Sequence, residues 1–279
     1  MADNSERNGN HGVVLNVEVE ANRNPPPPAS EVGCTVPFTQ KLMAEVLGTY
    51  FLIFAGCASV VVNVNNEKVV SLPGISIVWG LAVMVLVYSV GHISGAHFNP
   101  AVTIAFAACK RFPLKQVPAY ITAQVFGSTM AAGTLHLLFS GTHDVFTGTS
   151  PQGSDLQAFV IEFIITFYLM FIISGVATDN RAIGELAGLA DGATVLLNVL
   201  FAGYLILSTG YRSINEPSKE LGPCNSVESI QGIMDIYLTA PIIGVVSGAW
   251  TYNLVRYTDK PLREITKSAS FLKSSRNSN

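Results

Sequence analysis

The chain alternates between long apolar runs and short polar connections. Stretches without Asp, Glu, Lys or Arg cover residues 46–66, 69–109, 116–143, 163–178, 192–211 and 236–255. A helix that crosses a bilayer needs roughly 20 mostly apolar residues, so five runs fit one helix each and the longest holds one helix and a substantial remainder. The pattern therefore predicts an all-α membrane protein. Its six spanning helices are expected at about 42–63, 72–92, 117–139, 157–177, 183–204 and 235–255.

Composition agrees with a lipid-embedded protein. Of the 279 residues, 49% are hydrophobic and 13% are charged, and that charged share is about half of what soluble proteins carry. The net charge of -3 gives no support to nucleic-acid binding. The four cysteines lie far apart without the spacing of metal ligands, and no paired catalytic constellation is visible. We expect neither an enzyme nor a bound metal or cofactor.

The two ends of the chain are polar. Residues 1–37 contain a proline tract and predict a disordered tail, residues 38–256 form the membrane domain, and residues 257–279 form a second tail. Six spans place both tails on one side of the membrane, and thirteen of the sixteen Lys and Arg residues fall on that side. Because positive charge accumulates on the cytoplasmic side, we expect both termini to be cytoplasmic.

The chain contains an internal repeat. Residues 45–54 match residues 162–171, and residues 120–127 match residues 237–244, both at an offset of 117. The repeat defines two halves, at about 41–139 and 156–256, with three spans each. Because three is odd, the second half enters the membrane inverted. Inverted repeats place the solute path at their interface, near the bilayer midplane.

The segment after the second span predicts a re-entrant half helix. Residues 91–106 are too hydrophobic for an exposed loop and too short to span again. Asn99 is suited to cap a helix, Pro100 to occupy its first turn, and Ala101 to continue it. Irregular backbone at this depth is tolerated only inside protein or along a water-filled passage. The half helix points the positive end of its dipole toward the membrane centre, which disfavours cations there.

Two glutamates and two histidines are candidates for bracing this segment. Glu45 and Glu162 occupy matching places in the first and fourth spans. A carboxylate in a membrane helix needs a partner or a cavity, so we expect both to accept hydrogen bonds from pore-loop backbone, with a proton relay as the alternative. His92 and His97 flank the half helix and are expected to be hydrogen-bonded braces rather than metal ligands, with pH sensing left open.

The motif resembles a known family. Residues 94–103, Ser-Gly-Ala-His-Phe-Asn-Pro-Ala-Val-Thr, are similar to the first pore motif of the major intrinsic proteins, the aquaporin family. Residues 56–62, 178–188 and 255–272 look like plant nodulin-26-like intrinsic proteins. The resemblance implies two half helices, one pore per subunit and a homotetramer. It also implies passive passage of water, glycerol or metalloid acids, in the plasma membrane or a related endomembrane.

The family carries a second Asn-Pro-Ala motif in its second half, and this chain departs from it. The offset of 117 aligns Asn99, Pro100 and Ala101 with Glu216, Pro217 and Ser218. A rival alignment uses Asn215 as the capping residue. This departure leaves several alternatives open: a non-conducting or heterotetrameric subunit, altered selectivity with a cation leak, a loop that does not fold, and a secondary transporter.

The resemblance also maps the selectivity filter. Trp79 and Val199 match the large aromatic and the small aliphatic filter positions, and Ser213 and Lys219 take the other two, with Lys219 in place of the family's Arg. Lys is a mobile point charge, whereas Arg is a rigid fork of donors. Trp79 could instead face lipid, and Val199 could be ordinary helix packing.

Two further residues carry open interpretations. Asp191 lies within the fifth span, where the family has an uncharged residue, and it could pair with a neighbour, line the pore or destabilise the helix. Ser270 follows a basic residue by three positions and is a candidate for phosphorylation by a kinase. The basic residues around it could instead hold acidic lipid headgroups.

Overall fold

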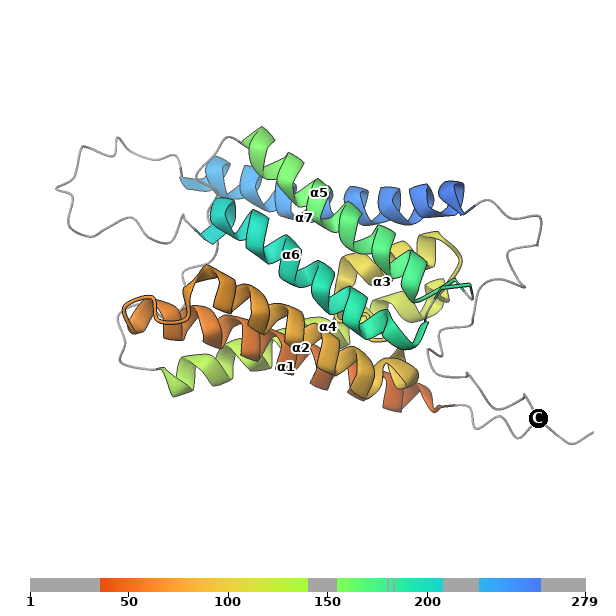
Figure 1. The fold of residues 1–279 in the computed structure, drawn as a ribbon, viewed down its shortest axis with the longest axis horizontal. Helices are drawn as coiled ribbons and strands as arrows, with labels where there is room; N and C mark the ends of the chain where they lie inside the picture. Colours follow the sequence, from red (N-terminus) through yellow and green to blue (C-terminus); the bar gives the residue numbers. More distant parts are fainter. Residues whose placement is uncertain (1–35, 140–154, 180, 183, 208–225, 257–279) are drawn as a thin grey trace, which may run out of the picture. The chain divides into compact units, whose positions relative to one another are not determined.

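The computed structural model describes residues 36–139, 155–179, 181–182, 184–207 and 226–256 (Figure 1). Within these ranges the chain is helical and contains no strand. Six long helices are α1 (Phe38–Asn65), α2 (Ser71–Ser94), α4 (Val117–Leu138), α5 (Asp155–Val176), α6 (Ala187–Leu207) and α7 (Ser226–Val255). The short elements are the helix α3 (Pro100–Ala108) and the 3₁₀ turns η1 (Leu114–Gln116) and η2 (Gly184–Leu186). The expectation of an all-α membrane protein is confirmed.

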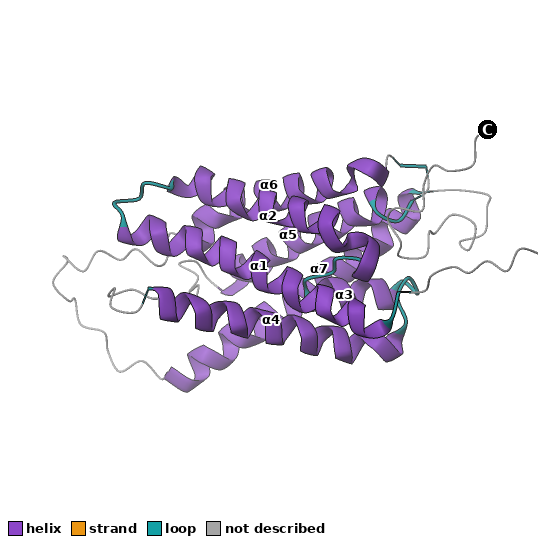
Figure 2. Ribbon diagram, turned by 90° about the horizontal axis from the view of Figure 1, so that it is seen from below, coloured by secondary structure: helices purple, strands orange, loops and turns teal. Residues whose placement is uncertain are grey.

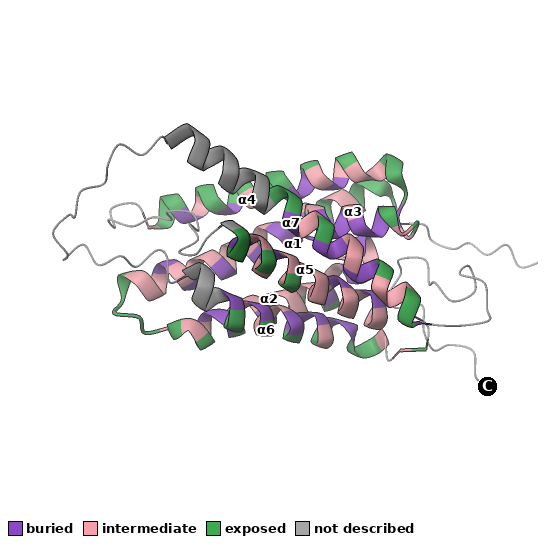
Figure 3. Cartoon of the chain, turned by 90° about the horizontal axis from the view of Figure 1, so that it is seen from above, coloured by how far each residue is buried: buried purple, intermediate pink, exposed green. Residues whose placement is uncertain are grey.

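The long helices have the length and surface of membrane spans. Five of them, α1, α2, α5, α6 and α7, are long and apolar enough to cross a bilayer. Helix α4 has 22 residues but carries more polar side chains, among them Gln124, Ser128 and Thr129. Large apolar side chains such as Phe126, Leu200 and Trp250 are exposed, and exposed positions recur along the long helices (Figure 3). In water such surfaces would cause association, whereas lipid solvates them.

The helices pair in a way that repeats between the two halves. Helix α1 packs against α4 and α2 in the first half, and α5 packs against α7 and α6 in the second. Between the halves, α2 packs along α6, and α3 contacts both α4 and α7 (Figure 2). The inverted repeat therefore appears as matching helix pairs joined through the central α2–α6 contact.

Glycines allow the matching pairs to approach closely. A Cβ atom on Gly127 of α4 would lie 2.4 Å from the carbonyl oxygen of Val46, and one on Gly244 of α7 would lie 2.6 Å from that of Phe163. Both contacts are related by the offset of 117 found in the sequence. A larger residue at either position would separate the paired helices, because backbone occupies the space that its side chain needs.

Helices α2 and α6 cross at a reciprocal pair of glycines. A Cβ atom on Gly80 would lie 2.6 Å from the oxygen of Gly192, and one on Gly192 would lie 2.5 Å from the oxygen of Gly80. The residues four positions further on take part in the same way, Leu196 against Gly80 and Met84 against Gly192. This crossing relates α2 to α6 by a local two-fold axis, so residue n of α2 corresponds to residue n + 112 of α6.

Candidate pore site

The chain turns back into the bundle between α2 and α3. Gly95 ends α2 in the left-handed conformation, at φ 94°, and Ala96 and Phe98 also take positive φ values of 51° and 48°. Asn99 is extended, and its Oδ1 accepts a hydrogen bond from the N–H of Ala101 at 2.8 Å. Pro100 occupies the first turn, where its missing N–H costs nothing. The turn is strained at non-glycine residues, so surrounding contacts must hold it.

Glu45 supplies those contacts. This side chain of α1 is fully buried, and its Oε1 accepts the N–H of His97 at 3.0 Å while its Oε2 accepts the N–H of Phe98 at 2.9 Å. The Oε2 atom also accepts a hydrogen bond from Nε2 of Gln124 on α4, at 2.8 Å. One carboxylate thus joins α1, α4 and the strained turn that begins the half helix.

Gln124 extends this network in a way that the sequence analysis missed. Its Nε2 also donates to Oγ1 of Thr103 at 3.0 Å, and the Thr103 hydroxyl donates to the carbonyl of Asn99 at 3.1 Å. The amide therefore ties α4 to the first turn of α3. The signal available in the sequence was a glutamine in an apolar helix, inside a segment that the repeat had already singled out.

The two histidines have different surroundings. The His97 ring is buried among Phe106, Phe112 and Tyr120, with ring centroids 4.8, 4.8 and 5.2 Å away, and its Nδ1 lies 3.1 Å from Oγ1 of Thr103. His92 is exposed in the last turn of α2. No cluster of metal-ligating side chains occurs in the described part of the chain.

The matching brace in the second half has a different composition. Glu162 is largely buried on α5, and the backbone that it is expected to hold lies outside the described residues. The offset of 117 places Pro241 of α7 where Gln124 stands in α4. Proline has no side-chain amide, so Pro241 cannot donate to Glu162 as Gln124 donates to Glu45.

Of the four predicted filter residues, two are in the described part. The Trp79 ring covers Gly56 of α1, where an added Cβ would lie 2.2 Å from the ring, and it packs against the cluster that contains Leu52 and Phe98. Trp79 thus turns inward rather than toward lipid. Val199 is partly buried on α6. The predicted residues Ser213, Glu216, Pro217, Ser218, Lys219 and Ser270 lie outside the described part.

Asp191 is an acidic side chain enclosed in the bundle. It is 4% exposed, and its Oδ1 atom has no hydrogen-bond partner in the structure. The glycine crossing relates Asp191 to Trp79, since each residue directly precedes its glycine. The position that holds the apolar ring of Trp79 in α2 therefore holds the carboxylate of Asp191 in α6.

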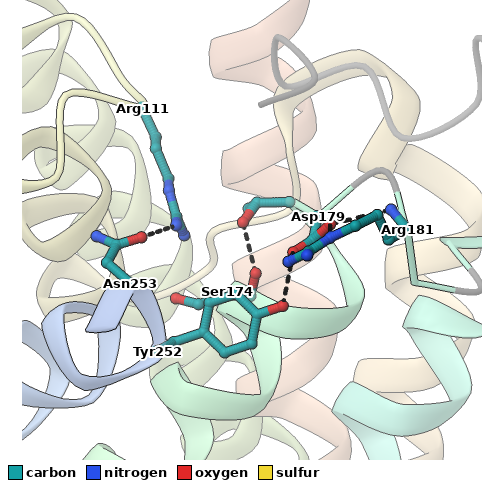
Figure 4. A network of polar contacts seen from close by, with 7 residues as sticks. Arg111, Ser174, Asp179, Arg181, Tyr252 and Asn253 are labelled. Carbon is teal, nitrogen blue, oxygen red and sulfur yellow. Dashed lines mark hydrogen bonds and ion pairs between the residues drawn. The ribbon is translucent and has the colours of Figure 1, made fainter. Parts of the chain in front are cut away.

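A polar network joins the ends of α5 and α7 at one end of the bundle (Figure 4). Asp179 accepts hydrogen bonds from Arg181, including Nη2 to Oδ2 at 2.6 Å, and from the hydroxyl of Tyr252 at 2.9 Å. The Arg181 guanidinium holds the pKa of the Asp179 carboxyl well below its usual range. This network fixes the chain as it leaves α5 and turns toward η2.

Together these features are typical of a solute passage rather than of a reaction centre. A capped half helix is held with its positive end inside the bundle, beside an inward-facing tryptophan. Backbone and amide groups at such a position can bind polar solutes one at a time, while the dipole disfavours cations.

Comparisons with known proteins agree with this description. A family model described as major intrinsic protein matches residues 34–252. The chain is 69% identical to "Aquaporin NIP1-2" of Arabidopsis thaliana, over 89% of this chain and 85% of the relative. It is 60% identical to "Nodulin-26" of Glycine max, over 98% of both. Among solved structures it resembles the aquaglyceroporin from Plasmodium falciparum, with a TM-score of 0.61, 25% identity, and coverage of 79% of this chain and 97% of that one.

Proposed function

The chain belongs to the major intrinsic proteins, in the plant nodulin-26-like subfamily, and is a passive membrane channel for small uncharged solutes rather than an enzyme; we propose that it carries water, glycerol and small metalloid acids. The observation that carries this proposal is the brace on α3, in which Glu45 and Gln124 hold Asn99 and its helix at the centre of the bundle. Trp79 and Val199 add an apolar wall that suits the carbon backbone of glycerol.

Ser213 and Lys219 are proposed to complete the filter. With Lys219 in place of a planar guanidinium, the polar side of the filter is mobile, and solute orientation is less strictly imposed. We expect a wider range of neutral solutes to pass than through a filter with Arg at that position.

The second pore motif is proposed to modify selectivity. At the offset of 117, Glu216 brings a carboxylate where the first half has the amide of Asn99, and Ser218 replaces Ala101 on the other side of Pro217. A carboxylate near the positive end of a half helix partly cancels its barrier to cations. Pro241 cannot donate as Gln124 does in the first half, so we expect the second half helix to be held less firmly.

Assembly and orientation are also proposals. The exposed apolar faces of the helices suit both lipid contact and association into a homotetramer, or into a heterotetramer with related channels. The distribution of Lys and Arg supports cytoplasmic termini, in the plasma membrane or a related endomembrane. A kinase acting on Ser270 would then find its target on the cytoplasmic side.

A comparison of solutes in proteoliposomes tests the proposed selectivity. We expect measurable swelling with water, glycerol and boric acid for the native chain. The triple variant E216N/S218A/K219R should lose any cation current while it keeps water flux. An unchanged ratio of cation to glycerol permeability in the triple variant would show that the second motif does not control selectivity.

A further inference from the structure

Two arginines from distant parts of the sequence meet at the end of α7. Arg111 lies in the connection after α3, and its Nη2 donates to Oδ1 of Asn253 at 2.6 Å, a contact that Figure 4 shows. Arg256 follows the last residue of α7, and its N–H donates to the carbonyl of Tyr252 at 2.9 Å. Residues three and four positions apart share a helix face. Arg111 and Arg256 are therefore held around the same final turn of α7.

The donors of this pair are not fully used. Arg256 is 4% exposed, and both of its terminal nitrogens are enclosed without a hydrogen-bond partner in the structure. The Nη1 atom of Arg111 is also buried without a hydrogen-bond partner in the structure. Burial lowers the pKa of the Arg111 guanidinium, and the neighbouring charge of Arg256 lowers it further. Burying a cation whose N–H donors are unpaired costs folding free energy, unless an anion or another acceptor binds those donors.

The acid beside them has no bonding capacity left. The Oδ1 atom of Asp179 accepts both the N–H and the Nε–H of Arg181, each at 3.0 Å, and Oδ2 accepts Nη2 of Arg181 and the hydroxyl of Tyr252. A carboxylate accepts about four hydrogen bonds. Asp179 is thus saturated by Arg181, with which it forms an ion pair, and by Tyr252.

The surroundings of the pair indicate where an anion would come from. Leu254 and Val255, which directly precede Arg256, are 78% and 65% exposed, as lipid-facing side chains are. The end of a membrane helix lies at the interface, at the level of the lipid headgroups. A lipid with its acyl chains along Leu254 and Val255 therefore has its headgroup at the same depth of the membrane as the two guanidiniums.

We propose that Arg111 and Arg256 form a binding site for the phosphate group of an anionic membrane lipid, at the membrane surface where α7 ends. Guanidinium groups match phosphate oxygens with two parallel hydrogen bonds, which a lysine cannot reproduce. Basic pockets between membrane helices bind headgroups in this way. Because the site is built from helix ends rather than pore residues, the proposal does not depend on which solute the channel carries.

The experiment compares lipid retention and thermal stability of the purified full-length protein. The protein in detergent is mixed with phosphatidylcholine, phosphatidic acid or inorganic phosphate. Bound lipid is counted by native mass spectrometry, and Tm is measured for each mixture. We expect phosphatidic acid to be retained and to raise Tm, and neither phosphatidylcholine nor inorganic phosphate to do so at the same concentration. R111Q and R256Q should weaken retention at least tenfold.

The neighbouring Lys110 provides a matched control. It is exposed, and K110Q removes the same charge one position away from Arg111. K110Q should retain phosphatidic acid as the native chain does, and R111K should recover only part of what R111Q loses. If R256Q does not fold, the R111Q and R111K pair still decides the question.

Equal losses in K110Q and R111Q would show diffuse attraction to basic charge and would overturn the proposal. So would retention that is unaffected in R111Q. Stabilisation by inorganic phosphate without retention of phosphatidic acid would indicate a site for a soluble anion and would exclude the lipid.

Discussion

Glu45 is the residue on which the geometry of the first half helix depends. It accepts two backbone N–H groups from a turn with positive φ values at Ala96 and Phe98. Hydrogen bonds to a charged acceptor are stronger than neutral ones, and no other side chain in the described part of the chain bonds to these two N–H groups. The residue thus holds the turn that begins the half helix.

Substitution of Glu45 by Gln should destabilise the protein. The amide keeps the shape but offers one acceptor oxygen in place of two, so a loss of about 3 kcal/mol is expected. Measured Tm should fall and glycerol flux should drop. E162Q is the matched variant. It should cost less, because Pro241 already removes one bond from that half. Equal losses in the two variants would contradict the unequal bracing.

In contrast to substitution of Glu45, substitution of Asp191 should stabilise the protein. Its Oδ1 is enclosed and unpaired in the structure, and an enclosed polar group without a partner costs about 1–3 kcal/mol. D191L should therefore raise Tm, and D191N should raise it less. Thermal melts and glycerol flux of both variants check this. A fall in Tm, or a loss of flux in a folded variant, would mean that the carboxylate contacts solute or a partner group.

At the scale of elements, the crossing of α2 and α6 fixes the centre of the bundle. Gly80 and Gly192 bring backbone against backbone, which leaves no room for a methyl group on either residue. The two helices can pack in this register only while both positions stay glycine. The crossing therefore holds the two halves together by direct backbone contact between α2 and α6.

G192A should disrupt this packing. The added Cβ would meet the Gly80 oxygen at 2.5 Å, so the helices must separate, and overpacking of this kind costs about 1–3 kcal/mol. Tm and the yield of monodisperse protein should both fall. G133A on α4 is the control, because nothing lies within 4 Å of its added Cβ. It should be neutral or slightly stabilising. Similar behaviour of the two variants would contradict the reciprocal crossing.

The connection after α5 should show a pH dependence. The pKa of Asp179 is depressed, first of all by its hydrogen bond from Arg181. Stability from a depressed carboxyl is fully present above the pKa of the unfolded chain, near 4, and is lost as pH falls toward the folded value. The Tm difference between the native chain and D179N should be constant from about pH 7 to pH 5 and should shrink below about pH 4. A difference that grows on acidification would have the wrong sign.

The sequence predicted the elements better than their contacts. Apolar runs located the long helices, and the Asn99-Pro100 pair placed the start of α3 correctly, because both signals are local. The contact of Gln124 with Glu45 and the glycine crossing depend on residues far apart in the chain. A single repeat offset of 117 also hid the relation between α2 and α6, whose offset is 112. The roles of Ser213, Glu216 and Lys219 stay predictions.

At the scale of the whole molecule, the repeat offsets of 117 and 112 show where the second half departs from the symmetry of the inverted repeat. Counting from α2 and α6, the equivalent of Asn99 is Tyr211, whereas counting from α4 and α7 it is Glu216. The five-residue difference must therefore be absorbed between α6 and α7. In the first half Glu45 and Gln124 brace the half helix, whereas residues 216–218 of the second half are predicted to form an altered motif. Conduction depends on whether the altered half still leaves a path.

Flux through the purified protein in liposomes tests this most directly. Stopped-flow light scattering would measure water and glycerol permeability, and the same preparation would be assayed for cation current. We predict water and glycerol flux above that of empty liposomes. No flux from protein shown to be folded and tetrameric would contradict the account and would identify the chain as a non-conducting subunit.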